Sequence, residues 1–150
     1  MSRPKRIYST PGDRPATGHH SVFDCHYHLV LVTKYRHKCL TEIMRSRAGE
    51  IVRSMLPPMC ALEACKGEED HLHLLLSIPP HIPLSKVVNS LKTVTARLLR
   101  KEYASHLKPF YWKPYLWSRS YFIATTGGAA LDVVRRYVES QGSKGAPRRA

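Results

Sequence analysis

The chain has 150 residues, a formal net charge of +13, and a hydrophobic content of 43%. This length fits one compact domain with short tails and excludes a large catalytic architecture. The positive charge indicates a polyanionic partner, and nucleic acid is the first candidate, because each phosphate neutralised by Lys or Arg releases condensed counterions. Ribosome-associated and membrane-surface proteins share this charge, so charge alone does not name the partner.

The two ends of the chain differ in composition from its middle. Residues 1–20 are basic and then rich in Pro, Gly, Ser and Thr, and residues 142–150 have the same character. We expect both to be flexible basic tails around one domain at residues 21–141. The first residues lack the apolar segment of a secretory signal, and no apolar run approaches the roughly 18 residues needed to span a bilayer. These features predict a soluble cytoplasmic protein without a membrane partner, associated with the nucleoid when bound to DNA.

The first half of the domain predicts a strand, a helix and a pair of strands. A β-branched and aromatic run at 21–35 predicts the first strand. Apolar residues three and four apart predict a helix over 41–56, which two prolines terminate. Residues 59–80 predict two strands joined by a polar turn at 66–70. The apolar stripe of the helix comprises Ile43, Met44, Ala48, Ile51, Val52 and Met55.

The second half predicts a helix, a strand and a further helix. Residues 83–103 form an amphipathic helical pattern, and a strand is predicted over 118–126 after a Pro- and aromatic-rich stretch. A last short helix is predicted over 130–141. The order βαββαβ predicts an α+β ferredoxin-like fold, with four antiparallel strands behind two helices and a C-terminal helix that carries Tyr137. The apolar stripe of the 83–103 helix comprises Leu84, Val87, Val88, Leu91, Val94, Leu98 and Leu99.

The sequence DHLHLLLSIPP, at 70–80, carries two histidines one residue apart. Side chains on a strand alternate between faces, so His71 and His73 share one face with Leu75, and the other leucines of this segment share the opposite face. Two imidazoles on one face can hold a divalent metal ion, and a pair of half-exposed surface histidines has the same pattern. A metal site would need a third ligand.

Two further patterns bear on a candidate site. His26 and His28 alternate in the same way on the first predicted strand, and periodicity does not rank this pair below the other. In the last predicted helix Tyr137 and Gln141 are four residues apart, so they lie on one face. Each of these two residues, taken alone, also fits a bland role as a packing aromatic or a solvated amide.

A His-x-His pair on a central strand, a basic surface, and a helix that presents Tyr and Gln beyond a Gly-Gly pair occur together here. In this combination the chain resembles the single-tyrosine HUH transposases of small insertion sequences, the IS200/IS605-like TnpA type, together with their REP-associated relatives. The resemblance extends from about residue 21 to 141, in the family's order. Its blocks are YHLVLVTKYRHKCL, DHLHLLLSIPP, LKTVTARLLRKE, and LWSRSYFIATTGG followed by VRRYVESQ.

The resemblance implies an enzyme that cleaves and rejoins single-stranded DNA at insertion-sequence ends. His71 and His73 would hold Mg²⁺ or Mn²⁺, with Gln141 as the third ligand. Tyr137 would attack the phosphorus in line and give a 5′-phosphotyrosyl enzyme and a free 3′-hydroxyl. Asp70 is a candidate both for the base that takes the phenol proton and for a group that orients His71.

The resemblance also implies the partners. Family members recognise imperfect hairpins at transposon ends and act as homodimers, in which the tyrosine helix of one subunit completes the site of the other. Gly127 and Gly128 would be the hinge for that exchange, because glycine tolerates the φ values that a mobile linker visits, although an ordinary strand-to-helix turn fits them equally. The basic residues predicted to contact DNA are Lys34, Arg36, Lys38, Lys92, Arg97 and Arg119.

Two alternatives stay open on the sequence. A non-catalytic ferredoxin-like module that binds single-stranded nucleic acid explains the charge and the fold. It predicts stacking aromatics on the open sheet face, however, where this chain has His71 and His73. A REP-associated housekeeping relative would share the chemistry and differ in its biological role.

Overall fold

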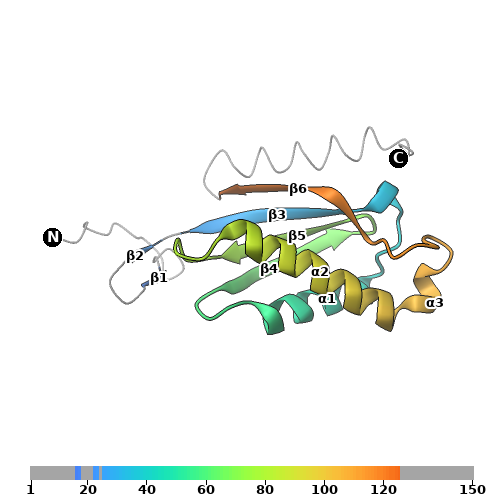
Figure 1. Cartoon of the computed structure of the whole chain (residues 1–150), viewed down its shortest axis with the longest axis horizontal. Helices are drawn as coiled ribbons and strands as arrows, with labels where there is room; N and C mark the ends of the chain where they lie inside the picture. The colour runs from blue at the N-terminus through green and yellow to red at the C-terminus, as the bar shows by residue number, and fades with distance from the viewer. Residues whose placement is uncertain (1–15, 18–21, 24, 126–150) are drawn as a thin grey trace.

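The structure is a computed structural model, which describes residues 16–17, 22–23 and 25–125 of the chain. The predicted C-terminal helix and the tail at 142–150 lie outside the described residues. Of the predicted N-terminal arm, the described part is β1 (Ala16–Thr17), which pairs antiparallel with β2 (Val22–Phe23). The rest of the described chain forms one sheet covered by helices (Figure 1).

The sheet is antiparallel, and its strands lie in the order β4-β5-β3-β6. β3 (His26–Thr33) pairs with β5 (His71–Ser77) on one side and with β6 (Trp117–Thr125) on the other. β4 (Ala61–Glu68) pairs with the outer side of β5. Along the chain β4 follows β3, but in the sheet β5 lies between these two strands. This strand order is that of the predicted ferredoxin-like topology, and the α+β class is confirmed.

The two long helices cover one face of the sheet (Figure 1). α1 (Glu42–Met55) begins after Thr41, whose hydroxyl accepts a hydrogen bond from the backbone N–H of Met44 at 3.1 Å and thereby satisfies one of the unpaired donors of the first turn. α2 (Leu84–Glu102) packs beside α1. Both helices begin and end within one residue of the predicted ranges.

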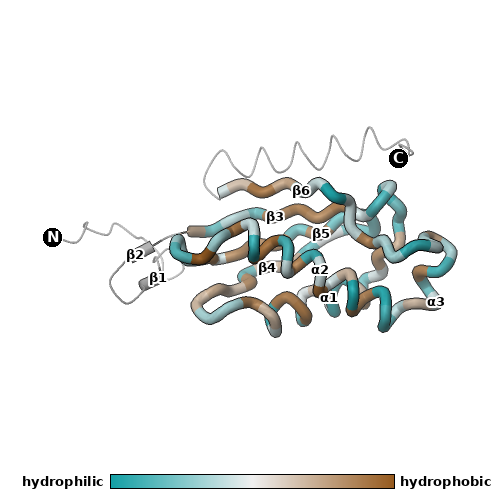
Figure 2. The backbone as a smooth tube through the Cα atoms, viewed as in Figure 1, coloured by the Kyte–Doolittle hydropathy of each residue, from teal (hydrophilic) through white to brown (hydrophobic). Residues whose placement is uncertain are grey.

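The core lies between the helices and the sheet. On β5 the side chains of Leu72, Leu74 and Leu76 are all 0% exposed, and Leu29 and Leu31 of the adjacent strand β3 are equally buried beside them. Figure 2 shows these central strands as largely hydrophobic segments beside mixed helices. This burial confirms the predicted alternation of faces on β5. Burial of each such leucine contributes roughly 1.5–3 kcal/mol to stability, so a one-residue shift in register, which would expose these leucines, is strongly disfavoured.

Four local predictions were wrong. The first predicted strand, 21–35, is shorter in the structure, because β2 belongs to a separate two-stranded sheet and residues 34–36 leave the strand in a 3-10 turn. Ile43 is 70% exposed rather than part of the core, because the stripe that meets the sheet begins one residue later, about 100° around the helix. The polar turn is shorter than 66–70, since β4 continues to Glu68, which pairs directly with His71. The stretch before the last strand begins with a short helix, α3 (Ala104–Leu107), which is about one turn long and therefore too short to show a helical period in the sequence.

We expect Gly67→Ala to destabilise the β4–β5 hairpin by roughly 1–3 kcal/mol in the free energy of unfolding. A Cβ at Gly67 would overlap the backbone carbonyl oxygen of His71 and lie 3.0 Å from the Cα of Leu72, and backbone atoms cannot move aside cheaply. The matched control is Gly49→Ala in α1, where the closest atom is a flexible arginine nitrogen at 3.4 Å. Urea unfolding should show that change to be neutral or stabilising by up to about 1 kcal/mol. Equal losses from the two changes would contradict the assigned close approach.

Candidate active site

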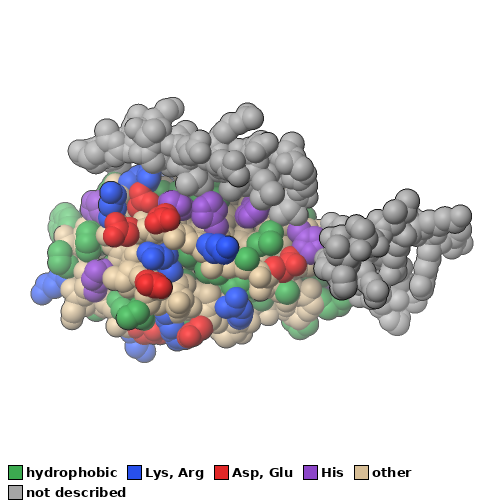
Figure 3. All heavy atoms as spheres, turned by 180° about the vertical axis from the view of Figure 1, so that it is seen from behind, with side chains coloured by type: hydrophobic (Ala, Val, Ile, Leu, Met, Phe, Trp, Pro, Cys, Tyr) green, Lys and Arg blue, Asp and Glu red, His purple; other side chains and the backbone are tan. Residues whose placement is uncertain are grey.

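The face of the sheet opposite the helices carries a group of histidines, which we call the histidine face. His71 and His73 of β5 lie opposite Val32 and Val30 of β3, so they project from one side of the sheet as predicted. Their ring centroids are 5.1 Å apart, and the ring of His28 lies 6.5 Å from that of His73. Figure 3 shows several histidine side chains in a row across this side of the molecule.

His71 is held in place by its neighbour Asp70. Its Nδ1 atom lies 2.9 Å from Oδ1 of Asp70, and the two side chains are 12% and 11% exposed. An ionised carboxylate only accepts hydrogen bonds, so the imidazole proton is on Nδ1. The lone pair of Nε2 is therefore left for a ligand, which is the arrangement of most metal-binding histidines.

The second oxygen of Asp70 is bound by Arg36. The guanidinium of Arg36 donates from Nε at 3.1 Å and from Nη2 to Oδ2 of Asp70. Burial by itself raises the pKa of the Asp70 carboxyl, but the hydrogen bonds from His71 and Arg36 outweigh burial and hold the pKa below its usual value. The carboxylate is therefore charged at neutral pH and orients His71 from behind.

Arg36 reaches Asp70 because the chain turns sharply after β3. The turn is η2 (Lys34–Arg36), in which Tyr35 and Arg36 have φ values of 61° and 57°, in the left-handed region that residues with a Cβ rarely adopt. Backbone hydrogen bonds from Thr33 to Asp70 (3.0 Å) and from Leu40 to the residue before Asp70 (2.8 Å) tie the turn to the hairpin tip. The surrounding contacts thus impose the unusual backbone that aims the guanidinium.

Burial keeps the other histidines of this face neutral. Burial, and to a smaller extent the nearby His71 and His28, lowers the pKa of His73 to about 4. Burial also lowers the pKa of His28, whose Nδ1 atom is enclosed and has no hydrogen-bond partner among the described residues. His26 points instead to an ion pair with Glu63. His26 and His28 share this face of β3, but His28 lies beside His73, whereas His26 lies farther along the strand and contacts Glu63 of β4.

The donors on this face suit a metal ion in part. His71 and His73 both offer imidazole nitrogens; the ring of His73 is kept neutral by burial, and that of His71 is oriented by a carboxylate. Among the described residues, no three His, Cys, Asp or Glu side chains gather closely enough to hold a metal. The predicted third ligand, Gln141, lies outside the described residues, as do Tyr137 and the glycines 127 and 128.

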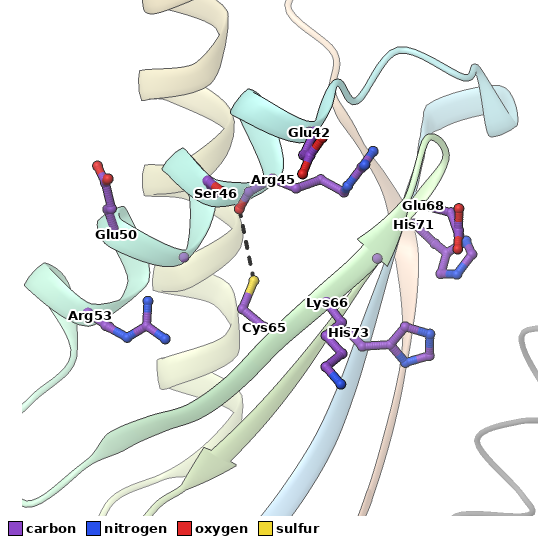
Figure 4. A pocket seen from close by; sticks show the side chains of 12 residues that line it. Glu42, Arg45, Ser46, Glu50, Arg53, Cys65, Lys66, Glu68, His71 and His73 are labelled. Atoms are coloured by element: carbon purple, nitrogen blue, oxygen red, sulfur yellow. Dashed lines mark hydrogen bonds between the residues drawn. The ribbon is translucent and has the colours of Figure 1, made fainter.

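A groove of about 680 Å³ borders the histidines at the outer edge of the sheet. Figure 4 shows Glu68, His71 and His73 pointing away from α1, whereas Cys65 faces Arg45 of that helix. Three basic and three acidic side chains line the groove, so it has no net charge when the histidines are neutral. Its charged lining residues are Arg45, Arg53, Lys66, Glu42, Glu50 and Glu68.

The basic residues predicted to contact DNA lie in different surroundings. Arg36 is engaged in its ion pair, and Nζ of Lys92 donates to the backbone carbonyls of Ser118 and Arg119 at 2.9 Å each. Burial lowers the pKa of Lys92. The ammonium of Lys34 lies over two tyrosine rings. The exposed residues of this set are Lys38, Arg97 and Arg119.

Sequence reasoning missed two contributions to the site. It assigned Arg36 to DNA, because periodicity says nothing of a residue beyond the end of a strand. It also gave no role to Tyr111, whose hydroxyl donates to the backbone carbonyl of Lys34 at 2.6 Å and supports the turn. The available signal was the pair of opposite charges, Arg36 and Asp70, each placed at the end of a predicted strand.

Comparison with known proteins identifies the family. The family model described as "Transposase IS200 like" matches residues 21–141. The chain belongs to the IS200-like transposase family. Membership implies DNA transposition and, with it, nuclease and transferase activity.

Individual relatives agree with this assignment. This transposase is 34% identical over 125 residues to the ISDra2 transposase TnpA of Deinococcus radiodurans, covering 82% of this chain and 88% of that protein. It is 30% identical over 126 residues to the transposase for insertion sequence element IS200 of Salmonella typhimurium, covering 81% and 80%. A crystal structure of a candidate transposase from D. radiodurans R1 superposes with a TM-score of 0.73 and 30% identity, covering 84% of this chain and 97% of that one. In the described part of the chain, every helix is too short or too polar to cross a bilayer.

We expect Arg36→Leu to destabilise this transposase by about 3 kcal/mol, because the buried Asp70 carboxylate loses its cationic partner. The same change in an Asp70→Asn background should cost much less, so a double-mutant cycle by urea unfolding measures the coupling. Arg47→Leu is the matched control. Arg47 pairs with Glu102 at the surface, where solvent screens the charges, so its removal should change the free energy of unfolding little. If Arg36→Leu lowered the free energy of unfolding equally with and without Asp70→Asn, Arg36 would stabilise the protein by some means other than its ion pair with Asp70.

The lowered pKa of His73 predicts how stability changes with pH. An unfolded histidine takes up its proton near pH 6.5 and folded His73 near pH 4, so the unfolded state binds more protons between these values. The free energy of unfolding should fall as pH falls through this window. His73→Asn should flatten the dependence, while the same change at exposed His81 should retain it. NMR titration of the His73 ring with a midpoint near pH 6.5 would contradict the assignment.

Proposed function

We propose that this transposase cleaves and rejoins single-stranded DNA at insertion-sequence ends through a covalent 5′-phosphotyrosyl intermediate on Tyr137. The observation that carries the proposal is the pair His71 and His73 on one face of β5, with Nδ1 of His71 bound by a charged Asp70. Oriented neutral imidazoles on a rigid strand suit phosphoryl transfer better than passive binding of nucleic acid. The alternative binding module would need stacking aromatics at these positions.

The proposed metal is Mg²⁺ or Mn²⁺, held by His71, His73 and Gln141. When bound, it would supply positive charge that polarises a non-bridging oxygen of the scissile phosphate. The imidazoles are uncharged ligands, so they leave that charge largely uncompensated. Asp70 keeps the Nδ1 proton of His71 in place, and Arg36 holds Asp70 in turn. Because both oxygens of Asp70 are engaged, the geometry supports the orienting role for this residue over that of the base.

In the proposed reaction, the phenolic oxygen of Tyr137 forms a bond to phosphorus while the bond from phosphorus to the 3′-oxygen breaks. The phenol proton passes to a base, and the leaving 3′-oxygen takes up a proton to become a free hydroxyl. The 5′-phosphate stays on the tyrosine, so the energy of the phosphodiester bond is retained. Attack by a different 3′-hydroxyl reverses the step and joins new ends without ATP.

The proposed partners are hairpin-bearing single-stranded DNA and a second copy of the chain. The family resemblance supports the homodimer, in which Gly127 and Gly128 let the tyrosine helix of one subunit serve the other. The net charge of +13 supports a nucleic-acid partner. Lys38, Arg97 and Arg119 are the exposed cations that we assign to phosphate contacts.

The test is formation of a covalent protein–DNA adduct. The full chain is incubated with single-stranded DNA from the flanks of its own gene, labelled at its 3′ end so that the label stays on the strand bound to the tyrosine, with Mg²⁺ or Mn²⁺, and resolved on a denaturing gel. We expect a labelled, protease-sensitive adduct that is absent with Tyr137→Phe, with His71→Ala and after metal chelation. Removing a metal ligand or the nucleophile should lower the adduct yield at least about 100-fold.

Two control variants keep the result specific. Tyr103→Phe replaces a half-buried tyrosine at the end of α2, and His81→Ala replaces an exposed histidine in the loop before that helix. Both should form the adduct as the unaltered protein does. Hairpin binding without any adduct would sink the proposal and favour a binding module or an inactive relative.

A further inference from the structure

A second surface of the molecule combines exposed aromatic rings with cations. After α3 the chain forms a groove of about 600 Å³, in which Trp112 is 91% exposed. The ammonium of Lys113 lies 5.3 Å from the centroid of the Trp112 ring. Tyr115 lines the same groove. We call this surface, together with Lys34 and Tyr35 beside it, the aromatic groove.

The groove continues onto the turn after β3. The rings of Tyr115 and Tyr35 meet edge to face with centroids 6.0 Å apart. The ammonium of Lys34 lies 5.1 Å from the Tyr115 centroid and 5.2 Å from the Tyr35 centroid. Rings and cations therefore alternate from Trp112 across to η2.

Hydrogen bonds hold the backbone around the groove in place. The Tyr111 hydroxyl and the backbone carbonyl of Leu116 bond the main chain of Lys34 at 2.6 Å and 2.7 Å. A backbone hydrogen bond from Tyr115 to Lys113, at 2.7 Å, fixes the turn that presents the rings. The residues lining the groove include no acidic side chain, and its cations are Arg100, Lys108 and Lys113.

The position of the groove relates it to the histidine face. Figure 1 shows η2 and the segment after α3 at the same end of the sheet. η2 joins the two surfaces, because Arg36 reaches Asp70 behind His71 while the preceding residue, Tyr35, packs on Tyr115. A nucleic-acid strand that leaves the histidine face at this end of the sheet would meet the groove.

We infer that the aromatic groove binds unpaired nucleotides of the single-stranded DNA substrate next to the scissile phosphate, with Trp112 stacking on a base. Removing an exposed aromatic ring from water by stacking is favourable, and every nucleic-acid base has a flat face that can stack on the ring. The neighbouring ammonium groups neutralise the phosphates between bases. Duplex DNA keeps its bases stacked inside and would leave Trp112 uncovered. The inference rests on the proposed function, since it adds a subsite to the same reaction.

The test uses tryptophan fluorescence of the full chain carrying Tyr137→Phe, so that cleavage does not consume the probe. The chain has two tryptophans, and Trp117 is 8% exposed, so quenching on addition of a short oligothymidylate reports Trp112. We expect quenching on binding. By a separate anisotropy assay with labelled oligothymidylate, Trp112→Ala should weaken binding roughly 5- to 100-fold, and Trp112→Phe should keep most of the affinity.

The matched control is Ile43→Ala, which removes another large exposed apolar side chain, on α1 and outside the lining of the groove, and should leave affinity unchanged. A blunt hairpin without unpaired flanks should bind Trp112→Ala as well as the unaltered protein. Equal binding of oligothymidylate by the variant and the unaltered protein would overturn the inference, as would an equal loss for the blunt hairpin.

The adduct assay separates the two proposals. If the adduct forms with Tyr137 while Trp112→Ala binds oligothymidylate normally, the groove is not a subsite and the proposed reaction stands. If no adduct forms while Trp112→Ala loses affinity for oligothymidylate, the reaction fails and the groove stands as a binding surface.

Discussion

The arrangement at the active end of the sheet depends on one buried carboxylate. Asp70 is 8% exposed, and a charge so placed must be matched by partners. It obtains them from His71, the next residue and the first of β5, and from Arg36 on the turn after β3. The left-handed backbone at Tyr35 and Arg36 brings the Arg36 guanidinium to this carboxylate, so the ion pair and the conformation of the turn depend on each other.

The same strand supplies the core and the proposed chemistry. The leucines of β5 are buried under the helices, and its histidines emerge on the opposite face between the side chains of β3 and β4. Packing on both sides removes water from His73, which lowers its pKa and keeps the ring neutral. The burial that stabilises the fold therefore also prepares a nitrogen ligand, so stability and function are linked at this strand.

The basic side chains of this protein have several different roles. Arg36 and Lys92 make contacts within the protein: Arg36 completes the ion pair with Asp70, and Lys92 joins α2 to β6 through two backbone carbonyls. Lys34 and Lys113 lie over aromatic rings, and a third group faces solvent. A count of basic residues thus identifies the class of partner, whereas only the surroundings of each cation indicate which of them can meet a phosphate.

The sequence by itself predicted the order of the long strands and helices, and the sharing of one face by His71 and His73, because strand and helix periodicities are local properties. The sheet topology followed from that order through the known preference for right-handed crossovers. Family resemblance supplied the roles of Tyr137 and Gln141, which lie outside the described residues. Tertiary structure decided that Arg36 serves Asp70, that His28 lies beside His73 while His26 contacts Glu63, and that Trp112 is exposed beside Lys113. These facts depend on contacts between segments far apart in the chain, and the spacing of residues along one segment carries no information about them.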